Sequence, residues 1–505
     1  MYTFFFYACE MSKHQVLCQL KKKHQSKNKK TRHFVRFFYI CLHIKYMLTA
    51  VDNKKKYTII TYGCQMNFSD SEVVSSILND NGYQSSDDHI NSDLILLNTC
   101  SIREKAELTI RKKLQSFKKL KKKNSNLKIG VLGCMAERLK EKFLTEEKMV
   151  DLVVGPDAYR DIPNLLRDVE IGNNAVNVIL SKDETYGDID PSRLKSNGIS
   201  AFVSITRGCD NMCTFCVVPF TRGRERSRDP KSIIKEILKL KNEGYSEITL
   251  LGQNVDSYLW YGGGLKKDFK DATELQKKSS LSFSKLLELI ATNFKSMRIR
   301  FTTSNPQDMS EDVLNVMAKH KNICKHIHLP VQSGSDKILN LMNRKHTINE
   351  YKELINKIRR IIPNCGISHD IITGFPNESE DDHKLTLELM NYVKYDFGFM
   401  FKYSERPGTP AYKKLDDNVP EKIKQKRLQE IIDLQQKHSF NNLKDYVGTN
   451  CEVLIEKESK KSSQFWCGRN SQNIMVVFPK KNLKPGETVS VKIIDNTSTT
   501  LIGRS

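Results

Sequence analysis

Short apolar runs alternate with amphipathic stretches from residue 57 to about residue 180. The apolar runs have the length of strands, and we predict strands at Tyr57–Tyr62, Leu94–Asn98, Lys128–Leu132 and Val150–Val154. The stretches between them have helical periodicity, and we predict helices at Ser69–Asn81, Glu104–Lys123 and Ala136–Leu144. Strands that alternate with helices indicate a parallel sheet with helices on both faces. We therefore expect residues 57–180 to form a Rossmann-like parallel α/β domain.

A second alternating series follows a polar, turn-rich segment, residues 181–200, which we interpret as a linker. Predicted strands of this series are Ala201–Thr206, Glu247–Leu251, Met297–Thr302, His326–Leu329, Gly366–Ile371 and Phe397–Tyr403. Such repeated βα units favour a complete or partial (β/α) barrel, which we assign to residues 201–440. Lys270–Ser280 is expected to be an inserted polar loop, and Glu421–His438 a helix that closes the domain.

The pattern changes to short β-branched strands in the last part of the chain. These strands are predicted at Glu452–Glu456, Phe465–Arg469, Ile474–Phe478 and Ser490–Ile494, with glycine-containing turns between them. Short, evenly spaced strands of this kind indicate a small antiparallel β-barrel, here over residues 441–505.

Residues 1–56 show no comparable periodicity and are expected to be a disordered or untranslated extension. Residues 1–46 hold ten Lys and Arg side chains against one acid, Glu10, in a chain whose net charge is +23. This segment could be a targeting arm or a basic tail, but we favour an untranslated extension before a start at Met47. The overall surplus favours nucleic acid as a partner, although a Lys-rich proteome would produce the same composition. We expect no signal peptide and no membrane contact.

Three of the thirteen cysteines, Cys209, Cys213 and Cys216, stand in the loop after the first strand of the second series. In a reducing compartment, cysteines at short spacing indicate a metal or redox site rather than disulfides. Three thiolates can bind three corners of a 4Fe–4S cluster and leave the fourth iron open for S-adenosylmethionine. One electron from such a cluster cleaves a C–S bond and releases a carbon radical. The alternative, structural zinc, needs a fourth Cys or His, and none is close in the sequence.

Cys64, Cys100 and Cys134 each follow a predicted strand of the first series. A single buried cysteine is usually a small hydrophobic residue. Three in equivalent positions at the ends of parallel strands predict a second 4Fe–4S cluster, also with an open iron. The remaining cysteines have no such setting and are interpreted as structural or incidental: Cys9, Cys18, Cys41, Cys324, Cys365, Cys451 and Cys467.

Glycine and polar residues follow the strands of the second series. Each of them could belong to an ordinary turn, but their shared location predicts the pocket for S-adenosylmethionine, since glycine lets the backbone approach a ligand closely. The candidates are Gly252, Gln253, Asn254, Ser304, Gln332, Ser333 and Gly374. Four arginines after the cysteine loop, Arg222, Arg224, Arg226 and Arg228, are either a solvated loop or a clamp for phosphate or carboxylate.

Three motifs carry a resemblance to a known family: Tyr62–Asn67, Asn98–Arg103 and Arg207–Arg226. From about residue 57 to residue 505 the chain resembles the radical S-adenosylmethionine methylthiotransferases, and within them the type that modifies isopentenyladenosine in tRNA. The resemblance implies an amino-terminal methylthiotransferase domain, a radical domain and a carboxyl-terminal TRAM domain. It also implies two 4Fe–4S clusters on the two cysteine triads, with Phe215 near the adenine of the cosubstrate.

The activity that the resemblance implies uses two molecules of S-adenosylmethionine. One donates a methyl group to a sulfur at the second cluster, and the other gives the radical that removes hydrogen from carbon 2 of the adenine. The target is the isopentenyl-adenosine immediately 3′ of the anticodon, so the partner is the anticodon stem-loop of tRNA. An electron donor such as flavodoxin or ferredoxin is also implied, and we expect a cytoplasmic monomer.

Two sibling activities and one different class remain as alternatives. The siblings act on threonylcarbamoyl-adenosine in tRNA or on an aspartate of a ribosomal protein, and Ser101–Arg103 favours the isopentenyl type over both. The different class is a non-catalytic iron–sulfur protein that binds RNA.

Overall fold

The computed structural model describes residues 54–100, 104–194 and 196–504. The predictions for residues 1–53 and for Ser101–Arg103 therefore lie outside the described residues. None of the helices in these three ranges is long and apolar enough to cross a membrane.

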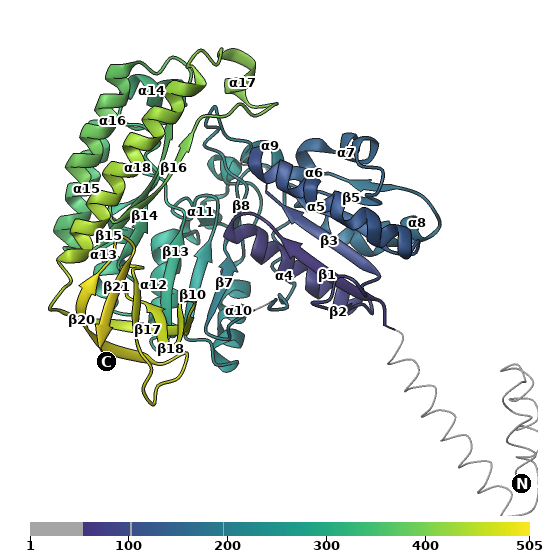
Figure 1. Ribbon diagram of the computed structural model, residues 1–505, viewed down its shortest axis with the longest axis horizontal. Helices are drawn as coiled ribbons and strands as arrows, with labels where there is room; N and C mark the ends of the chain where they lie inside the picture. The colour runs from purple at the N-terminus through teal and green to yellow at the C-terminus, as the bar shows by residue number, and fades with distance from the viewer. Residues whose placement is uncertain (1–53, 101–103, 195, 505) are drawn as a thin grey trace, which may run out of the picture.

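The amino-terminal sheet has six parallel strands in the order β2-β1-β3-β4-β5-β6 (Figure 1). The strands are β1 Lys56–Thr61, β2 Gln84–Ser85, β3 Leu94–Thr99, β4 Lys128–Gly133, β5 Leu152–Val154 and β6 Ala175–Asn177. Its helices are α4 Gln65–Asp80, α5 Glu104–Lys123, α6 Cys134–Leu139, α7 Glu141–Glu146 and α8 Ile162–Glu170, with a 3-10 turn at Tyr159–Asp161. Residues of α4 and α8 belong to one apolar core and those of α5, α6 and α7 to another, so both faces are covered. The parallel α/β prediction is confirmed.

The strand order places the cysteine loops at a functional position in this sheet. The chain leaves β1 toward β2 on one side and toward β3 on the other, and ligands of open α/β sheets bind at such switch points, beyond the carboxyl ends of the strands.

The predicted helix Ala136–Leu144 is wrong in one respect. It is two helices, because Lys140 has a φ of 51° and this left-handed backbone interrupts the helix.

Six further parallel strands form a partial barrel from two three-stranded sheets, β13-β10-β7 and β14-β15-β16. The strands are β7 Ser200–Ser204, β10 Glu247–Leu251, β13 Arg298–Thr302, β14 His326–His328, β15 Gly366–Thr373 and β16 Phe397–Lys402. The backbone N–H of Cys324 donates to the carbonyl of Ile299 at 2.9 Å, and this bond joins the two sheets. The prediction of a barrel is thus confirmed in its partial form.

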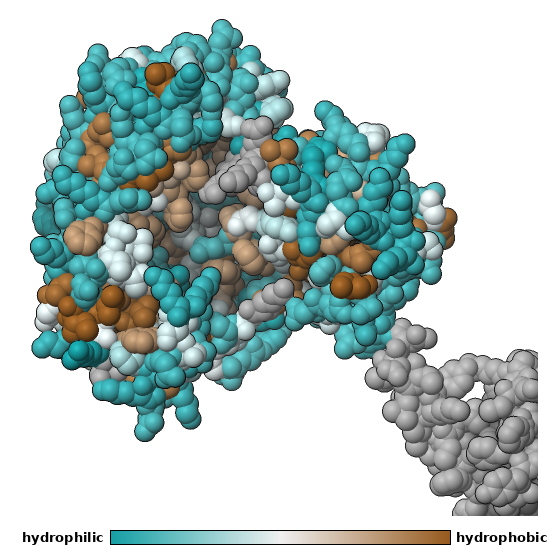
Figure 2. Space-filling model, viewed as in Figure 1, coloured by the Kyte–Doolittle hydropathy of each residue, from teal (hydrophilic) through white to brown (hydrophobic). Residues whose placement is uncertain are grey.

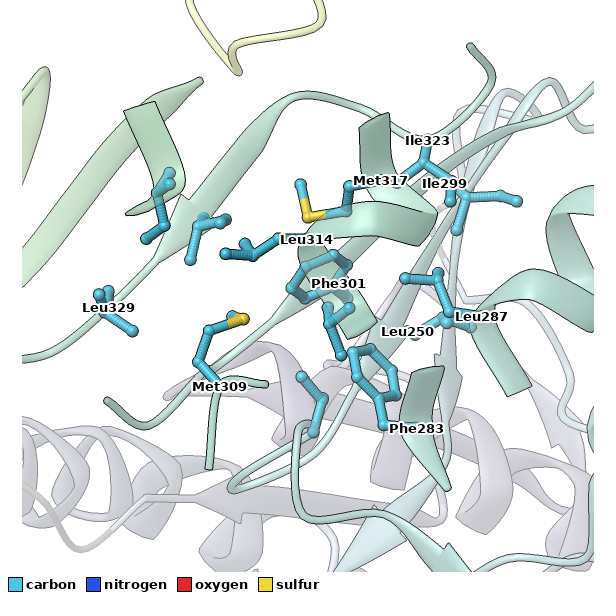
Figure 3. Close-up of a cluster of buried hydrophobic side chains, with 14 of the residues drawn as sticks. Leu250, Phe283, Leu287, Ile299, Phe301, Met309, Leu314, Met317, Ile323 and Leu329 are labelled. Carbon is cyan, nitrogen blue, oxygen red and sulfur yellow. The ribbon is translucent and has the colours of Figure 1, made fainter. Parts of the chain in front are cut away.

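Helices pack on the outer face of the partial barrel (Figure 1). They are α10 Pro230–Asn242, α12 Phe283–Asn293, α13 Glu311–Lys319, α14 Asp336–Leu341, α15 Ile348–Ile361, α16 Glu380–Val393 and α18 Glu421–Lys444. Figure 3 shows part of the core between them and the sheet, where the rings of Phe283 and Phe301 lie 5.2 Å apart, edge to face.

Shorter elements lie around this barrel. They are β8 Thr206–Arg207, α9 Val218–Thr221, β9 Arg226–Ser227, β11 Leu259–Trp260, a 3-10 helix at Lys266–Asp271, α11 Glu274–Lys278, β12 Leu281–Ser282 and α17 Pro410–Lys414. The segment Lys270–Ser280, predicted as a loop, contains α11, which a capping box of Thr273 and Gln276 begins.

The described residues between β6 and β7 form no helix or strand, but two of them pack against or pair with residues of the neighbouring domains. Tyr186 is buried against Tyr159 in the amino-terminal core. Arg193 pairs with Glu72 on α4 and with Glu236 on α10, both at 2.6 Å. The segment predicted as a linker therefore holds the first two domains together.

The last strands close a small barrel in the order β17-β18-β19-β21-β20. They are β17 Asn450–Ser459, β18 Ser462–Arg469, β19 Met475–Pro479, β20 Thr488–Asn496 and β21 Thr500–Arg504. The antiparallel prediction holds for every pair except β19 and β21, which are parallel. One parallel pair is required, because an odd number of strands cannot alternate in direction all the way round a closed barrel. The sequence analysis did not predict β21.

Candidate active site

The loop with Cys209, Cys213 and Cys216 runs from β8 to α9, at the carboxyl end of the first barrel strand. Gly208 begins the loop with a φ of 77°, and a Cβ there would overlap the carbonyl of Arg224, so the sharp entry requires glycine. Burial raises the pKa of Cys209 and that of Cys216, and the neighbouring thiols raise both further. Binding to a metal deprotonates such thiols, so this triad fits an iron–sulfur cluster better than it fits free thiolates.

The second triad gathers at the switch point of the amino-terminal sheet. Cys64 precedes α4, Cys100 follows β3 and Cys134 begins α6. A hydrogen bond with Cys100 lowers the pKa of Cys64 to about 6. Gly63, with a φ of 131°, lets the first two loops approach, because a Cβ there would lie 2.5 Å from the Cβ of Cys100.

Buried polar side chains fix the loops of this second triad. Cys64 Sγ donates to Asn67 Oδ1 at 3.3 Å, and Asn67 Nδ2 donates to Asn98 Oδ1 at 3.1 Å. The hydroxyl of Thr99 donates to the carbonyl of Leu132 at 2.8 Å. These bonds join the ends of β1, β3 and β4, so the positions of the three cysteines are fixed by hydrogen bonds at the edge of the sheet.

The segment after Cys216 reaches the second triad across the domain boundary. Arg222, at the end of α9, donates from Nε to Cys134 Sγ at 3.2 Å. Figure 2 shows the surface hollowed between these domains. In the described part of the chain, no three His, Cys, Asp or Glu side chains are close enough to hold one metal ion. Cysteine thiols are the usual ligands of iron–sulfur clusters.

Three of the four arginines after the loop with Cys209, Cys213 and Cys216 belong neither to a solvated loop nor to an open clamp. Arg222, Arg226 and Arg228 are buried and pair with Asp70, Asp157 and Glu236, in that order. Arg224 is exposed and lies 3.3 Å from Asp210. Both interpretations were thus wrong for three of the four. Asp70 and Asp157, which the sequence analysis missed, carry no motif that would mark them.

Polar atoms without partners gather at the ends of β10 and β13. Among the described residues, both amide atoms of Gln253, Oδ1 of Asn254 and Oγ of Ser304 are buried and have no hydrogen-bond partner. Burial raises the pKa of the adjacent Asp256 to about 7. Buried polar atoms are almost always paired, so this set is suited to a polar ligand such as the cosubstrate.

The other pocket candidates lie at the ends of β14 and β15. Ser333 Oγ accepts from the N–H of Ser335 at 3.2 Å, and the N–H of Gly374 donates to Glu378 at 3.0 Å. Gln332 has a φ of 77° in the same turn as Ser333. Phe215 lies edge-on to Phe375, with centroids 6.5 Å apart. These residues are placed by turns and apolar packing, close to the strand ends that the sequence indicated.

Three family models match the chain. They are Uncharacterized protein family UPF0004 over residues 56–155, the Radical SAM superfamily over residues 203–390 and the TRAM domain over residues 444–505. A solved structure of the radical S-adenosylmethionine methyltransferase TsrM from Kitasatospora setae, with cobalamin and a 4Fe–4S cluster bound, is similar with a TM-score of 0.52. It is 12% identical and covers 71% of this chain and 74% of that chain, so the likeness concerns the fold.

Curated relatives are much closer in sequence. One from Christiangramia forsetii is 65% identical over 451 residues, which are 89% of this chain and 94% of the relative. One from Bacteroides fragilis is 50% identical over 455 residues, which are 90% and 96% of the two chains. Both are named tRNA-2-methylthio-N(6)-dimethylallyladenosine synthase.

The partial barrel with its cysteine loop and the matching models define a radical S-adenosylmethionine enzyme. Its amino-terminal and TRAM domains complete the arrangement that the sequence motifs indicated. The chain belongs to the family of tRNA-2-methylthio-N(6)-dimethylallyladenosine synthases.

Proposed function

We propose that this chain adds a methylthio group to carbon 2 of the isopentenyl-adenosine immediately 3′ of the anticodon in tRNA. The name of its relatives describes this product, and they match the chain along nearly their whole length. The net charge of +23 and the TRAM domain suit an RNA partner.

Cys209, Cys213 and Cys216 would hold the radical 4Fe–4S cluster, and Cys64, Cys100 and Cys134 the auxiliary one. When bound, the two clusters supply the electron that cleaves S-adenosylmethionine and the site at which sulfur is carried.

The residues around the triads bind and orient the reactants. Gln253, Asn254 and Ser304 offer buried, unpartnered polar atoms to the polar groups of S-adenosylmethionine. Gly252 precedes them, and its missing side chain makes room for Thr206, while Phe215 packs beside the adenine of the ligand. Because these groups are shielded from water, their hydrogen bonds to the ligand are stronger than in solution.

One observation carries the proposal: Arg222 Nε of the radical domain lies 3.2 Å from Cys134 Sγ of the amino-terminal domain. This contact supports a reaction that uses both triads on one adenine between them, rather than two independent sites.

The test is nucleoside mass spectrometry of tRNA from a strain that lacks the gene, complemented with variants of it. The full chain and Cys324→Ala should restore 2-methylthio-isopentenyladenosine, whereas Cys213→Ala and Cys100→Ala should leave unmodified isopentenyladenosine. If the deletion instead changes the threonylcarbamoyl nucleoside, the sibling activity is correct. If Cys213→Ala complements fully, the protein is a non-catalytic RNA binder.

Iron analysis of the purified chain tests the number of clusters. We expect about eight iron atoms per chain, and a value of about four would contradict the presence of the auxiliary cluster. We further propose a cytoplasmic monomer that takes its electrons from a flavodoxin or ferredoxin. Size-exclusion chromatography and reconstitution with either donor test these two points.

A further inference from the structure

Arg222 lies at the carboxyl end of α9, a few residues after the radical triad, and its side chain reaches into the amino-terminal domain. Its Nε donates to Cys134 Sγ at 3.2 Å, and its Nη2 donates to Asp70 Oδ2 at 2.7 Å. The side chain is 3% exposed. One guanidinium therefore contacts a thiol of the auxiliary triad and is anchored to α4 at the same time.

Asp70 fixes the orientation of that guanidinium. Its Oδ1 accepts from Arg207 Nη1 at 2.8 Å, and its Oδ2 accepts from the hydroxyl of Tyr159 at 3.3 Å as well as from Arg222. Burial would raise the pKa of Asp70, but Arg207 and Arg222 outweigh it and lower the pKa. The carboxylate is thus a charged, fully hydrogen-bonded anchor.

The ion pairs around this anchor contain more arginines than carboxylates. Arg207, Arg222 and Arg226 are three buried cations, and Asp70 and Asp157 are the two carboxylates with which they pair. A buried charge without compensation is costly, so the surplus positive charge favours an anion nearby. Cys134, in contact with Arg222 Nε, is placed to supply it once metal binding has deprotonated the thiol.

One donor of Arg222 is still available. Among the described residues, its Nη1 is buried and has no hydrogen-bond partner. A guanidinium presents its donors in a rigid planar fork, so Nη1 is directed by the same two contacts that hold Nε and Nη2. A buried donor fixed beside a thiol of the triad suits a second sulfur acceptor.

We propose that Arg222 is a positioning residue for the auxiliary site: it holds the thiolate of Cys134 through Nε and offers Nη1 to a sulfur atom of the group that the triad binds. The proposal rests on the proposed assignment of Cys64, Cys100 and Cys134 as cluster ligands. Hydrogen bonds to sulfur and nearby positive charge stabilise the reduced form of an iron–sulfur cluster. Arg222 should therefore raise the reduction potential of the auxiliary cluster.

The test uses the full-length chain with Cys209, Cys213 and Cys216 replaced by alanine, so that the auxiliary triad alone can bind iron. Iron content and a redox titration followed by electron paramagnetic resonance are measured with and without Arg222→Gln. We expect a shift of the potential to more negative values in Arg222→Gln. Arg222→Lys, which keeps the charge but not the fork, should shift it less.

Arg193→Gln is the matched control. Arg193 also bridges the two domains through Glu72 and Glu236, but neither partner is a cysteine. An unchanged potential in Arg222→Gln, or an equal shift in Arg193→Gln, would overturn the proposal. Loss of iron in Arg222→Gln but not in Arg193→Gln supports it, because Cys134 is then no longer held. If the parent protein itself binds no iron, the ligand assignment fails, and the role of Arg222 fails with it.

Discussion

Arg300 of β13 donates a hydrogen bond of 2.6 Å to the carbonyl oxygen of Asn470 in the turn between β18 and β19. The same guanidinium donates to the carbonyl of Ser471 at 3.2 Å and to Glu247 at 2.9 Å. The terminal barrel is thus bound to the amino ends of the radical-domain strands, at the opposite end from the cysteine loop. An RNA that contacts both must extend along the molecule.

Replacing Arg300 with alanine should loosen this contact. The change removes the bond to the carbonyl of Ser471 and leaves the carbonyl of Asn470 and the carboxylate of Glu247 with Arg298, at 2.9 and 3.3 Å. We expect a loss of about 2–3 kcal/mol, seen as a lower unfolding midpoint and faster proteolysis between the two domains. Lys319→Ala, which removes an exposed ion pair with Glu288, is the control and should stay within about 0.5 kcal/mol. A wild-type midpoint in Arg300→Ala would contradict this account.

Gly252 is required at the end of β10 because its neighbours leave no space for a side chain. A Cβ at this position would overlap Oγ1 of Thr206. Gly252→Ala should cost about 1–3 kcal/mol and weaken the binding of S-adenosylmethionine. Adding Thr206→Ala should restore part of both, because it removes the overlapping atom. Unfolding curves and equilibrium dialysis of the single and double variants measure this, and full affinity in Gly252→Ala would argue against the pocket.

His369 should make the stability of the radical domain depend on pH. Burial lowers its pKa to about 4 from an ordinary value of 6.5, and its Nε2 lies 2.9 Å from Gln435 Oε1. Between pH 6.5 and 4 the unfolded chain binds a proton here that the folded chain does not. Stability is therefore complete above pH 6.5 and falls as the pH drops toward 4, by an amount on the order of 3 kcal/mol. His369→Gln should reduce the slope of the unfolding midpoint against pH in this window, and an unchanged slope would exclude this histidine.

The periodicity of the chain was sufficient to predict the strands that carry the site. Leu94–Asn98, Lys128–Leu132 and Glu247–Leu251 were found almost to the residue, because buried parallel strands are continuous apolar runs between polar loops. Cys64, Cys100 and Cys134 were grouped from the same strands, since parallel strands end at one edge of a sheet, whereas Cys209, Cys213 and Cys216 were grouped by their short spacing in one loop. Short edge strands such as β2 and β6 bury little, and their sequences lack a clear pattern.

The contacts between domains could not be predicted in this way. Arg222 was singled out as one of four alternating arginines, but nothing near it in the sequence indicates Asp70 or Cys134 as partners. Their approach depends on how α9 packs against α6, which is a property of the assembled domains. Likewise, Tyr186 is part of a polar segment, and its burial depends on a core formed elsewhere in the chain.

Asn254 offers the sharpest test of the S-adenosylmethionine pocket. Its Nδ2 donates to Asp308 at 2.6 Å, while its Oδ1 is buried without a partner among the described residues. Asn254→Ala removes the free acceptor, and we expect about tenfold weaker binding of S-adenosylmethionine with little change in tRNA affinity, because one hydrogen bond in a dry site is worth about 1.4 kcal/mol. Asn322→Ala is the matched control, since this half-buried amide donates to the carbonyls of Ala291 and Phe294 at the other end of β13. Equal losses of cosubstrate affinity in the two variants would show that Asn254 acts through stability rather than through contact with the ligand.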